Sequence, residues 1–456
     1  MRWTYLGHAM WLAQAGRLRI LFDPLLDGTS TGGVFEVVPR RRLDVSELRP
    51  DFIVVSHRHP DHFDPESLRQ LAQLDPETVV LTSDPLVSDL ATAVGFSTVA
   101  LLDAMQRVRL ADGVTLLTTP SAIPPDEDPE WGVMVATADG VVWNQVDTVF
   151  RGLGDVHHVL QQAELSLGEV GAPWPLALVL ARWLPMREIE AALGQATGFP
   201  LEAYRQLLEE IAALGAHRIV PSAAGQRHRP PYDAMNRLVY PLSPSRFVRD
   251  IGRRSTALAS LAPVGSTWHV SDGRSYPGEA CPWVDIAEPE PPTDFRPVAA
   301  LPELSDPGHP DLTETQLRER CERWVRDILR PSLEPDLGTG DDPHRLTLRI
   351  VYASGEQCFT LLKQGPRVTV REGYEVDYDV YNAIVGSMFV DVIEGRRHWG
   401  EPLLAGLLRA TRRSYRVVAG APLQPTGVGT VFLYHGLSYR DSHERAIARY
   451  LRSLTR

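Results

Sequence analysis

A run of histidines and an aspartate directly after a strand-like apolar segment constrains this sequence more than any other feature. Phe52–Val55 is continuously apolar, as expected for a strand buried on both faces, and the next residues read Ser-His-Arg-His-Pro-Asp-His-Phe. Because side chains two residues apart on an extended chain point the same way, His57 and His59 can share one metal ion. Asp61 and His62, on the turn that follows, are placed to serve a second. Two metal ions about 3.5–4 Å apart can activate an oxygen atom, so the motif predicts a dinuclear site; the alternative is a solvated polar loop.

The composition excludes several other classes of protein. The 456 residues, 43% of them hydrophobic and 23% charged, are typical of a globular protein with two or three domains. A formal net charge of −12 gives no support for nucleic acid or an anionic membrane as a partner. Lys363 is the only lysine, which excludes a Walker phosphate loop and leaves one candidate for a Schiff base. Three widely spaced cysteines and the lack of a long apolar run predict a cytoplasmic protein.

Apolar periodicity and turn signals predict strands early in the chain and helices later. Hairpins are predicted over residues 10–22 and 132–146, the second turning at Asp139-Gly140. A helix is predicted to begin after Asp64 as N-cap, with Pro65 at its first position. Further helices are predicted over residues 201–214, 314–329 and 442–454.

Because of its histidine motif, the sequence resembles the metallo-β-lactamase superfamily. The runs YLGHA (residues 5–9) and ILFDP (residues 20–24) resemble the branch that holds ascorbate-phosphate lactonases and CMP-sialic acid hydroxylases. The resemblance covers roughly residues 1–230 and implies an α/β fold, an αβ/βα four-layer sandwich with a dinuclear site at one rim. His8 and Asp23 fall where the family has residues that support the site; the alternative is that each is a polar group at a strand end.

The resemblance implies further site residues, with two departures from the family pattern. Asp147 corresponds to the aspartate that bridges the metals, although Val146 replaces the preceding glycine. Asp61 and Asp147 are therefore the predicted catalytic residues. The third histidine of the first metal is missing, and Glu127 and Glu130 are the candidates to replace it; the alternative is a solvated acidic loop.

The last histidine of the family pattern is displaced as well. The expected position after residue 221 reads Ser-Ala-Ala-Gly-Gln-Arg-His, so His228 is the candidate ligand, and an exposed loop histidine is the alternative. Arg227 and Arg229 are predicted to hold an anionic group of a small-molecule substrate, because guanidinium binds carboxylate and phosphate bidentately.

The missing histidine decides between two predicted functions. A carboxylate in place of an imidazole favours iron, and some superfamily members with glutamate at this position are diiron oxygenases. The first prediction is a non-haem diiron monooxygenase that hydroxylates or N-oxygenates a small substrate, with dioxygen as cosubstrate and an external reductase, since the cysteines cannot form a Rieske centre. The alternative is a dinuclear zinc or manganese hydrolase, such as a lactonase or phosphoesterase. A metal-stabilised carrier of a hydrophobic ligand is a third possibility.

The distribution of proline predicts the domain organisation. Prolines are concentrated between residues 276 and 310, too densely for a regular element. The sequence therefore predicts a catalytic domain at residues 1–255, a linker at 256–310 and a smaller α+β domain at 311–456. The last domain faintly resembles a sterol-carrier-like lipid-binding module; the alternatives are a cap over the active site and a homodimer contact.

Overall fold

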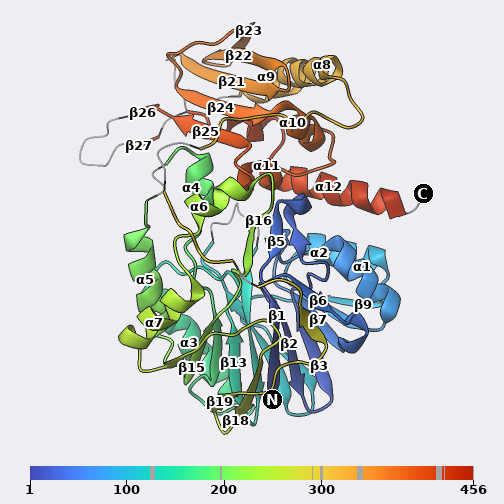
Figure 1. Cartoon of the computed structure of the whole chain (residues 1–456), viewed down its shortest axis with the longest axis vertical. Coiled ribbons are helices and arrows are strands. Elements are labelled where there is room, and N and C mark those ends of the chain that lie inside the picture. Colours follow the sequence, from blue (N-terminus) through green and yellow to red (C-terminus); the bar gives the residue numbers. More distant parts are fainter. Residues whose placement is uncertain are drawn as a thin grey trace. The chain divides into compact units, whose positions relative to one another are not determined.

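The computed structural model describes residues 1–123, 129–195, 198–289, 291–297, 301–335, 343–416, 424–425 and 427–454 (Figure 1). The chain divides into two units. Unit 1 comprises Met1–Met186, Phe199–Arg229 and Tyr240–Phe295, and unit 2 comprises Arg187–Gly198, Pro230–Val239 and Arg296–Arg456.

The first sheet of unit 1 has eight strands in the order β19-β18-β1-β2-β3-β7-β8-β9. Their bounds are β1 Arg2–Gly7, β2 Met10–Ala15, β3 Leu18–Phe22, β7 Phe52–Val55, β8 Val79–Thr82, β9 Thr98–Leu101, β18 Thr267–Ser271 and β19 Arg274–Pro277. The strands from β3 to β9 are parallel neighbours, and helices α1 (Pro65–Leu74) and α2 (Pro85–Val94) connect the last three of them. These crossovers bring the carboxyl ends of β7 and β8 to the same edge of the sheet.

The second sheet has seven strands in the order β10-β11-β12-β13-β14-β15-β17. Their bounds are β10 Arg107–Ala111, β11 Val114–Pro120, β12 Trp131–Thr137, β13 Gly140–Asn144, β14 Leu178–Ala181, β15 Arg218–Pro221 and β17 Leu258–Ala259. The strands from β13 to β17 are parallel. Helices α3 (Leu153–Gly168), α5 (Leu201–Ala212) and α7 (Pro244–Arg254) lie between them in sequence.

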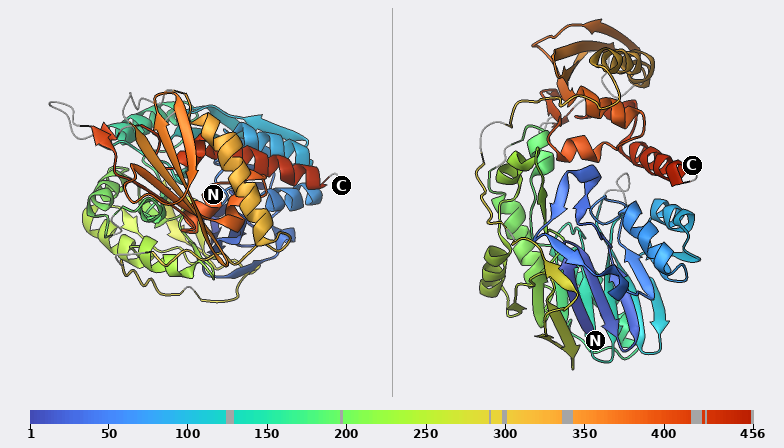
Figure 2. Two further views of the ribbon diagram at one scale, coloured as in Figure 1. Left: turned by 90° about the horizontal axis from the view of Figure 1, so that it is seen from above. Right: turned by 45° about the vertical axis from the view of Figure 1, so that its right-hand side comes forward.

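Strand β12 shows how the layers of unit 1 are held together. Val133 and Val135 belong to a core that also contains Trp3 and Phe22 of the first sheet, whereas Met134 belongs to a core shared with α3, α5 and α7. Successive side chains of a strand point to opposite faces, so β12 contributes to both cores. The sheets thus pack face to face with helices outside, and the predicted αβ/βα sandwich is confirmed (Figures 1 and 2).

Locally encoded elements form where the sequence predicts them. Strand β7 has the predicted bounds, and α1 begins at Pro65 with Asp64 as N-cap, whose carboxylate accepts a hydrogen bond from Ser67 N at 2.9 Å. Both predicted hairpins form, as β2–β3 and β12–β13. The helix predicted over residues 314–329 is divided, because α8 ends at Trp324 and a π-helical turn follows.

Residues 256–295, which the sequence assigns to a linker, contribute strands to unit 1. Strand β18 pairs with β1, and β20 (Val284–Ile286) pairs with β6 (Arg41–Leu43). Proline density is misleading here because the prolines lie at strand ends and between strands. Pro277, for example, ends β19 at the edge of its sheet, where a missing N–H is tolerated.

Unit 2 combines a five-stranded sheet with helices. The strand order is β23-β22-β21-β24-β25, with bounds β21 His344–Tyr352, β22 Gly355–Gln364, β23 Arg367–Glu372, β24 Val380–Val385 and β25 Leu408–Arg412. Helix α10 (Gly386–Ile393) packs against α8 (Glu314–Trp324), β21 and β24. The terminal helix α12 spans Tyr439–Leu454. None of the helices in the described ranges is long and apolar enough to cross a membrane.

The single lysine is part of the interior of unit 2. Lys363 is fully buried on β22. Its Nζ donates to the backbone carbonyls of Leu333, Pro335 and Gly365 at 2.8, 2.9 and 2.8 Å, and to that of Glu334 at 3.4 Å. The ammonium group thus holds together the chain after α9 (Arg330–Ser332) and the turn after β22, and it is engaged as a structural donor.

Candidate metal centre

The histidine loop begins where β7 ends, at the rim of the first sheet. His57 and His62 are buried, and the side chain of His59 is 33% exposed. The amides of His62 and Phe63 both donate to the carbonyl of His59 at 2.9 Å, which closes the loop into a tight turn. This turn directs the side chains of the motif towards one another.

A buried ion pair anchors the middle of this loop. Arg58 donates to both carboxylate oxygens of Asp84 at 2.6 and 2.7 Å, and both side chains are fully buried. Asp84 is also the N-cap of α2 and accepts from Leu86 N at 2.9 Å. The loop after β7 is therefore fixed to the N-cap of α2, two residues after the end of β8.

A first group of possible metal ligands contains His57, His59 and Glu130. Each offers one ligand atom, and these atoms lie within 4.8 Å of one another. His57 Nε2 is 2.8 Å from His59 Nδ1, which in turn is 3.7 Å from Glu130 Oε1. Glu130 directly precedes β12, so the acidic segment before that strand brings a carboxylate to the histidines. Glu127, the other sequence candidate, lies outside the described residues.

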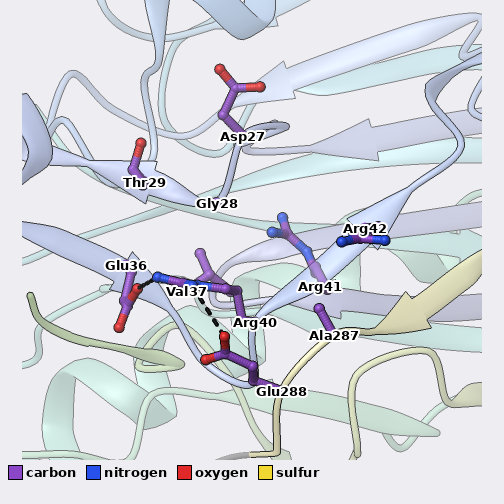
Figure 3. Close-up of a pocket in the computed structure, with 10 residues that line it drawn as sticks. All are labelled: Asp27, Gly28, Thr29, Glu36, Val37, Arg40, Arg41, Arg42, Ala287 and Glu288. Carbon is purple, nitrogen blue, oxygen red and sulfur yellow. Dashed lines mark hydrogen bonds and ion pairs between the residues drawn. The ribbon is translucent and has the colours of Figure 1, made fainter.

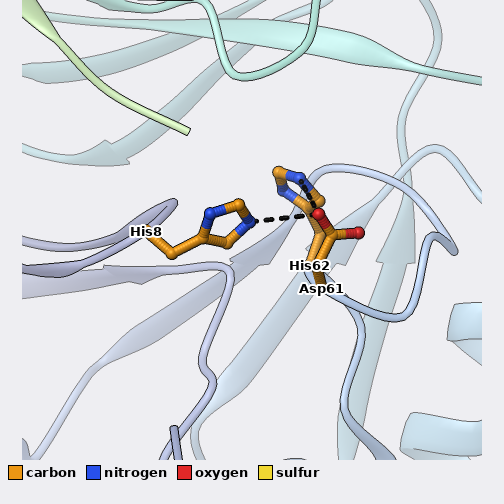
Figure 4. A group of neighbouring side chains, drawn as sticks. All are labelled: His8, Asp61 and His62. Atoms are coloured by element: carbon orange, nitrogen blue, oxygen red, sulfur yellow. Dashed lines mark ion pairs between the residues drawn. The ribbon is translucent and has the colours of Figure 1, made fainter. Parts of the chain in front are cut away.

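A second group contains His8, Asp61 and His62 (Figure 4). His8 Nε2 is 3.2 Å and His62 Nε2 is 3.6 Å from Asp61 Oδ2. Both imidazole Nε2 atoms are buried, and both lie within ion-pair distance of a carboxylate. Two buried imidazole nitrogens that face a carboxylate form a donor set suited to a divalent cation.

The backbone around His8 explains how this side chain reaches the site. His8 lies in the turn between β1 and β2 and has a left-handed φ of 51°, which histidine tolerates better than most residues. Ala223 N donates to the His8 carbonyl at 3.1 Å. A Cβ on Gly225 would lie 2.9 Å from His8 N, so this close approach requires glycine. The segment after β15 therefore packs on the turn that carries His8.

Asp147 forms a third group of possible ligands with His57 and His62, one histidine from each of the other two groups. Its Oδ2 is 3.1 Å from His62 Nε2 and 3.8 Å from His57 Nε2. Asp147 follows β13, and the preceding Val146 has φ 52°, a conformation that glycine adopts readily and valine rarely does. The turn before Asp147 therefore has the backbone conformation of a glycine, although valine occupies the position.

Asp23 orients two of the histidines from beneath the site. Its carboxylate accepts hydrogen bonds from Ser56 N at 2.8 Å, Ser56 Oγ at 2.9 Å and His62 Nδ1 at 3.0 Å. Because Ser56 Oγ gives its hydrogen to Asp23, it accepts from His57 Nδ1, 2.9 Å away. Both imidazoles therefore bond through Nδ1, which leaves Nε2 as the atom through which each would bind a metal ion, His62 after loss of its second proton.

The charges of this cluster are strongly coupled. Burial lowers the pKa of His57 well below its ordinary value, and the neighbouring His62 adds to this effect. Burial alone would lower the pKa of His62, but Asp147 and Asp61 raise it well above the usual value. Burial alone would raise the pKa of Asp61, yet His62 and His8 hold it well below its ordinary value. Asp61 is thus a carboxylate and His57 a neutral imidazole, the forms in which each can bind a metal.

Other predicted residues lie outside the three ligand groups. His228 is buried, with its ring 4.4 Å from that of Phe35 and 5.8 Å from that of Tyr240. Arg227 lies opposite Glu36 in the pairing of β16 (Gln226–His228) with β5 (Phe35–Val37). Arg229 Nε is 3.9 Å from a Glu36 oxygen. Their assignments as ligand and substrate-binding residues stay predictions.

Gln226 is a site residue that the sequence does not reveal. Its Nε2 donates to Asp61 Oδ2 at 2.8 Å, and its Oε1 accepts from Ser30 Oγ at 3.3 Å. Glutamine is not a usual metal ligand, and the contact depends on the pairing of β16 with β5, which are far apart in sequence. Sequence analysis that looks only for residue types that bind metals therefore misses Gln226.

The sequence relationships agree with this fold. Residues 2–170 match the beta-lactamase superfamily domain. This part of the chain, less than half of its length, is therefore similar to the metallo-β-lactamase superfamily.

Individual relatives cover different parts of the chain. A UPF0173 metal-dependent hydrolase of Pyrobaculum aerophilum is 24% identical over 188 residues, which are 40% of this chain and 79% of the relative. A protein of Mycolicibacterium smegmatis named as a Rieske 2Fe-2S iron-sulfur protein is 31% identical over 236 residues, 49% of this chain and 43% of that protein. The match therefore spans less than half the length of the second relative.

Solved structures are similar over more than half of the chain. An isothiocyanate hydrolase from Delia radicum gut bacteria has 16% identity and a TM-score of 0.39, over 60% of this chain and 100% of its own. A mutant of the CmlA beta-hydroxylase has 15% identity and a TM-score of 0.40, over 61% of this chain and 54% of its own.

Proposed function

We propose that the chain is a dinuclear metal-dependent hydrolase that acts on a small molecule. The observation that carries this proposal is the pair of buried Nε2 atoms of His8 and His62, which lie 3.2 and 3.1 Å from the carboxylates of Asp61 and Asp147. Imidazoles and carboxylates gathered at such distances form the donor set of a divalent metal site. The relatives named as metal-dependent hydrolases support the same function.

The geometry favours a particular division of ligands. His57, His59 and Glu130 would hold the first metal, and His8, Asp61 and His62 the second. Asp147 would bridge, because its Oδ2 is near a ligand histidine of each group. In this assignment His8 replaces His228 as the last histidine, since the small residues after β15 leave room for the turn that carries His8.

Metal ions bound there would supply Lewis-acid polarisation of the substrate and lower the pKa of water. The chain's own residues fix the geometry in which this chemistry occurs. Asp23 and Ser56 set the imidazole tautomers, and Gln226 holds the orientation of Asp61. Arg227 is the proposed contact for an anionic group of the substrate.

Metal analysis combined with a substrate panel tests this function. The chain as purified should contain close to two zinc or manganese ions and hydrolyse at least one lactone, ester or phosphodiester. His59→Ala should lose metal and activity together, whereas Arg17→Gln, an exposed arginine on the turn between β2 and β3, should change neither. A metal-loaded chain that hydrolyses no member of the panel would contradict the proposal.

Glu130 supports a second candidate, a diiron dioxygen-dependent oxygenase. Its carboxylate stands beside His57 and His59 where imidazole would complete a zinc site, and carboxylate ligands favour iron. An oxygenase of this kind would need an external reductase, because the three cysteines are free and widely separated.

Iron content and the optical spectrum distinguish this candidate from the hydrolase. Two irons per chain, with a spectrum that changes when the reduced protein meets dioxygen, would favour the oxygenase. In that case Glu130→His should shift the metal preference from iron towards zinc. Iron-free protein with hydrolase activity would exclude it.

A further inference from the structure

A cavity of about 380 Å³ in unit 1 is lined by three consecutive arginines (Figure 3). Its walls come from the β3–β4 connection, β5, β6 and the segment after β20; β4 spans Thr29–Ser30. The lining residues are Asp27, Gly28, Thr29, Glu36, Val37, Arg40, Arg41, Arg42, Ala287 and Glu288. None of them belongs to the three groups of possible metal ligands.

The charges in this cavity are unevenly matched. Arg40 is paired with Glu36 at 2.8 Å and with Glu288 at 3.2 Å. Figure 3 shows Asp27 directed away from the arginines, and neither Arg41 nor Arg42 forms an ion pair with any described residue. Glu36 and Glu288 are thus both paired with Arg40, and Arg41 and Arg42 have no ion-pair partner among the described residues, although Asp27 also lines the cavity.

Arg41 is a buried cation whose partners among the described residues are neutral groups. Its side chain is 8% exposed. Nε donates to the Leu6 carbonyl, and Nη2 donates to the Leu25 carbonyl at 2.7 Å and lies 3.6 Å from Met10 Sδ. Nη1 is buried and has no hydrogen-bond partner in the part of the chain that the structure describes. A buried guanidinium is normally paired with an anion, so this arrangement is incomplete by itself.

The unpartnered nitrogen faces the cavity wall at Gly28. A Cβ at Gly28 would lie 2.9 Å from Arg41 Nη1, and the left-handed φ of 71° at this residue also favours glycine. Figure 3 shows the Arg41 guanidinium between Gly28 and the side chain of Arg42. Burial lowers the pKa of Arg41 to about 10, which still leaves it cationic near neutral pH.

We propose that this cavity binds a small oxyanion, a phosphate or carboxylate group, between Nη1 of Arg41 and the guanidinium of Arg42. Guanidinium groups bind both kinds of oxyanion with charge-assisted hydrogen bonds. The site lies apart from the metal ligands and does not depend on the hydrolase function. Arg41 connects the site to β1 through the carbonyl of Leu6, two residues before His8.

Calorimetric titration of inorganic phosphate and of acetate tests the proposal, with the full chain at constant ionic strength. Because a metal centre can itself bind oxyanions, the titrations use His59→Ala as background. This background should bind at least one of the two anions, and the tighter one identifies the ligand group. Adding Arg42→Gln should weaken binding about tenfold or more, through loss of a charge-assisted contact.

Arg17→Gln in the same background serves as the matched control and should leave binding unchanged. Arg41→Lys, which keeps the charge but loses the planar fork, should also weaken binding if it folds. No heat of binding for either anion up to about 10 mM, a range that would detect millimolar affinity, would overturn the proposal. Equal binding with and without Arg42→Gln would overturn it too.

Discussion

The Asp23 carboxylate accepts a hydrogen bond from His62 Nδ1 at 3.0 Å, and both side chains are buried. The same oxygen accepts from Ser56 Oγ at 2.9 Å, and Ser56 in turn orients His57. One carboxylate on the β3 side therefore sets the tautomer of two histidines on the β7 loop. Asp23 itself has φ 41°, an unfavourable backbone conformation of the kind that is often retained at functional sites.

Asp23→Asn should weaken metal binding. An amide can present its NH₂ group to His62 and no longer selects the Nδ1–H tautomer, and loss of such an outer partner typically costs about 10–100-fold in metal affinity. Competition against a chromophoric chelator measures the effect. Asp51→Asn, an exposed aspartate that accepts from Arg19 N, is the control. Equal affinities for the two variants would show that Asp23 does not tune the site.

His8→Asn should remove a ligand of the second metal and keep the backbone, because asparagine tolerates the left-handed conformation found at this residue. Metal analysis should find about one ion fewer per chain, since one ligand position lies at only one of the two ions. His228→Asn, in the residue that packs against Phe35, should retain the full metal content. If His228→Asn lost an ion and His8→Asn did not, His228 and not His8 would be the ligand.

Removal of the metals should lower the melting temperature of unit 1. Ions that bind only the folded state stabilise it by about 2.7 kcal/mol when their free concentration is 100 times the Kd. Differential scanning calorimetry before and after treatment with a chelator should show the loss, and added zinc, manganese or iron(II) should reverse it. A melting temperature that does not respond to chelator or metal would argue against a metal-stabilised fold.

Arg58→Met should destabilise unit 1 strongly. It leaves Asp84 buried without its cation, and breaking a buried pair costs about 3–5 kcal/mol. The exposed pair of Arg151 and Asp155 is the comparison, because Arg151→Gln should cost less than about 1 kcal/mol. Urea unfolding of both variants measures the difference. Similar costs would mean that the loop is anchored by other contacts.

The sequence predicts the centre of this site because its signals are local. The apolar run of β7, the spacing of His57 and His59, and the N-cap Asp64 are all encoded within a few residues of one another. The fold of unit 1 follows from the same patterns together with the family resemblance. Metal preference does not follow from these patterns, because it depends on which carboxylate joins the histidines.

Features that depend on distant segments could not be predicted in the same way. The place of His8 in a ligand group results from the packing of Gly225 against a turn near the start of the chain. The contact of Gln226 with Asp61 requires the pairing of β16 with β5. The density of prolines wrongly predicts a linker in the segment where β20 pairs with β6. Composition alone does not show that such a segment forms a strand or which strand it pairs with.

The burial of Lys363 has a practical consequence for anyone who labels this protein. Every exposed side-chain cation is a guanidinium or an imidazole, so amine-directed dyes, cross-linkers and acetylating reagents meet no lysine on the folded surface. Lys363 becomes reactive only when the carbonyls of residues 333–335 and 365 release its Nζ. Acylation of this one side chain would therefore serve as a built-in reporter of the opening of unit 2.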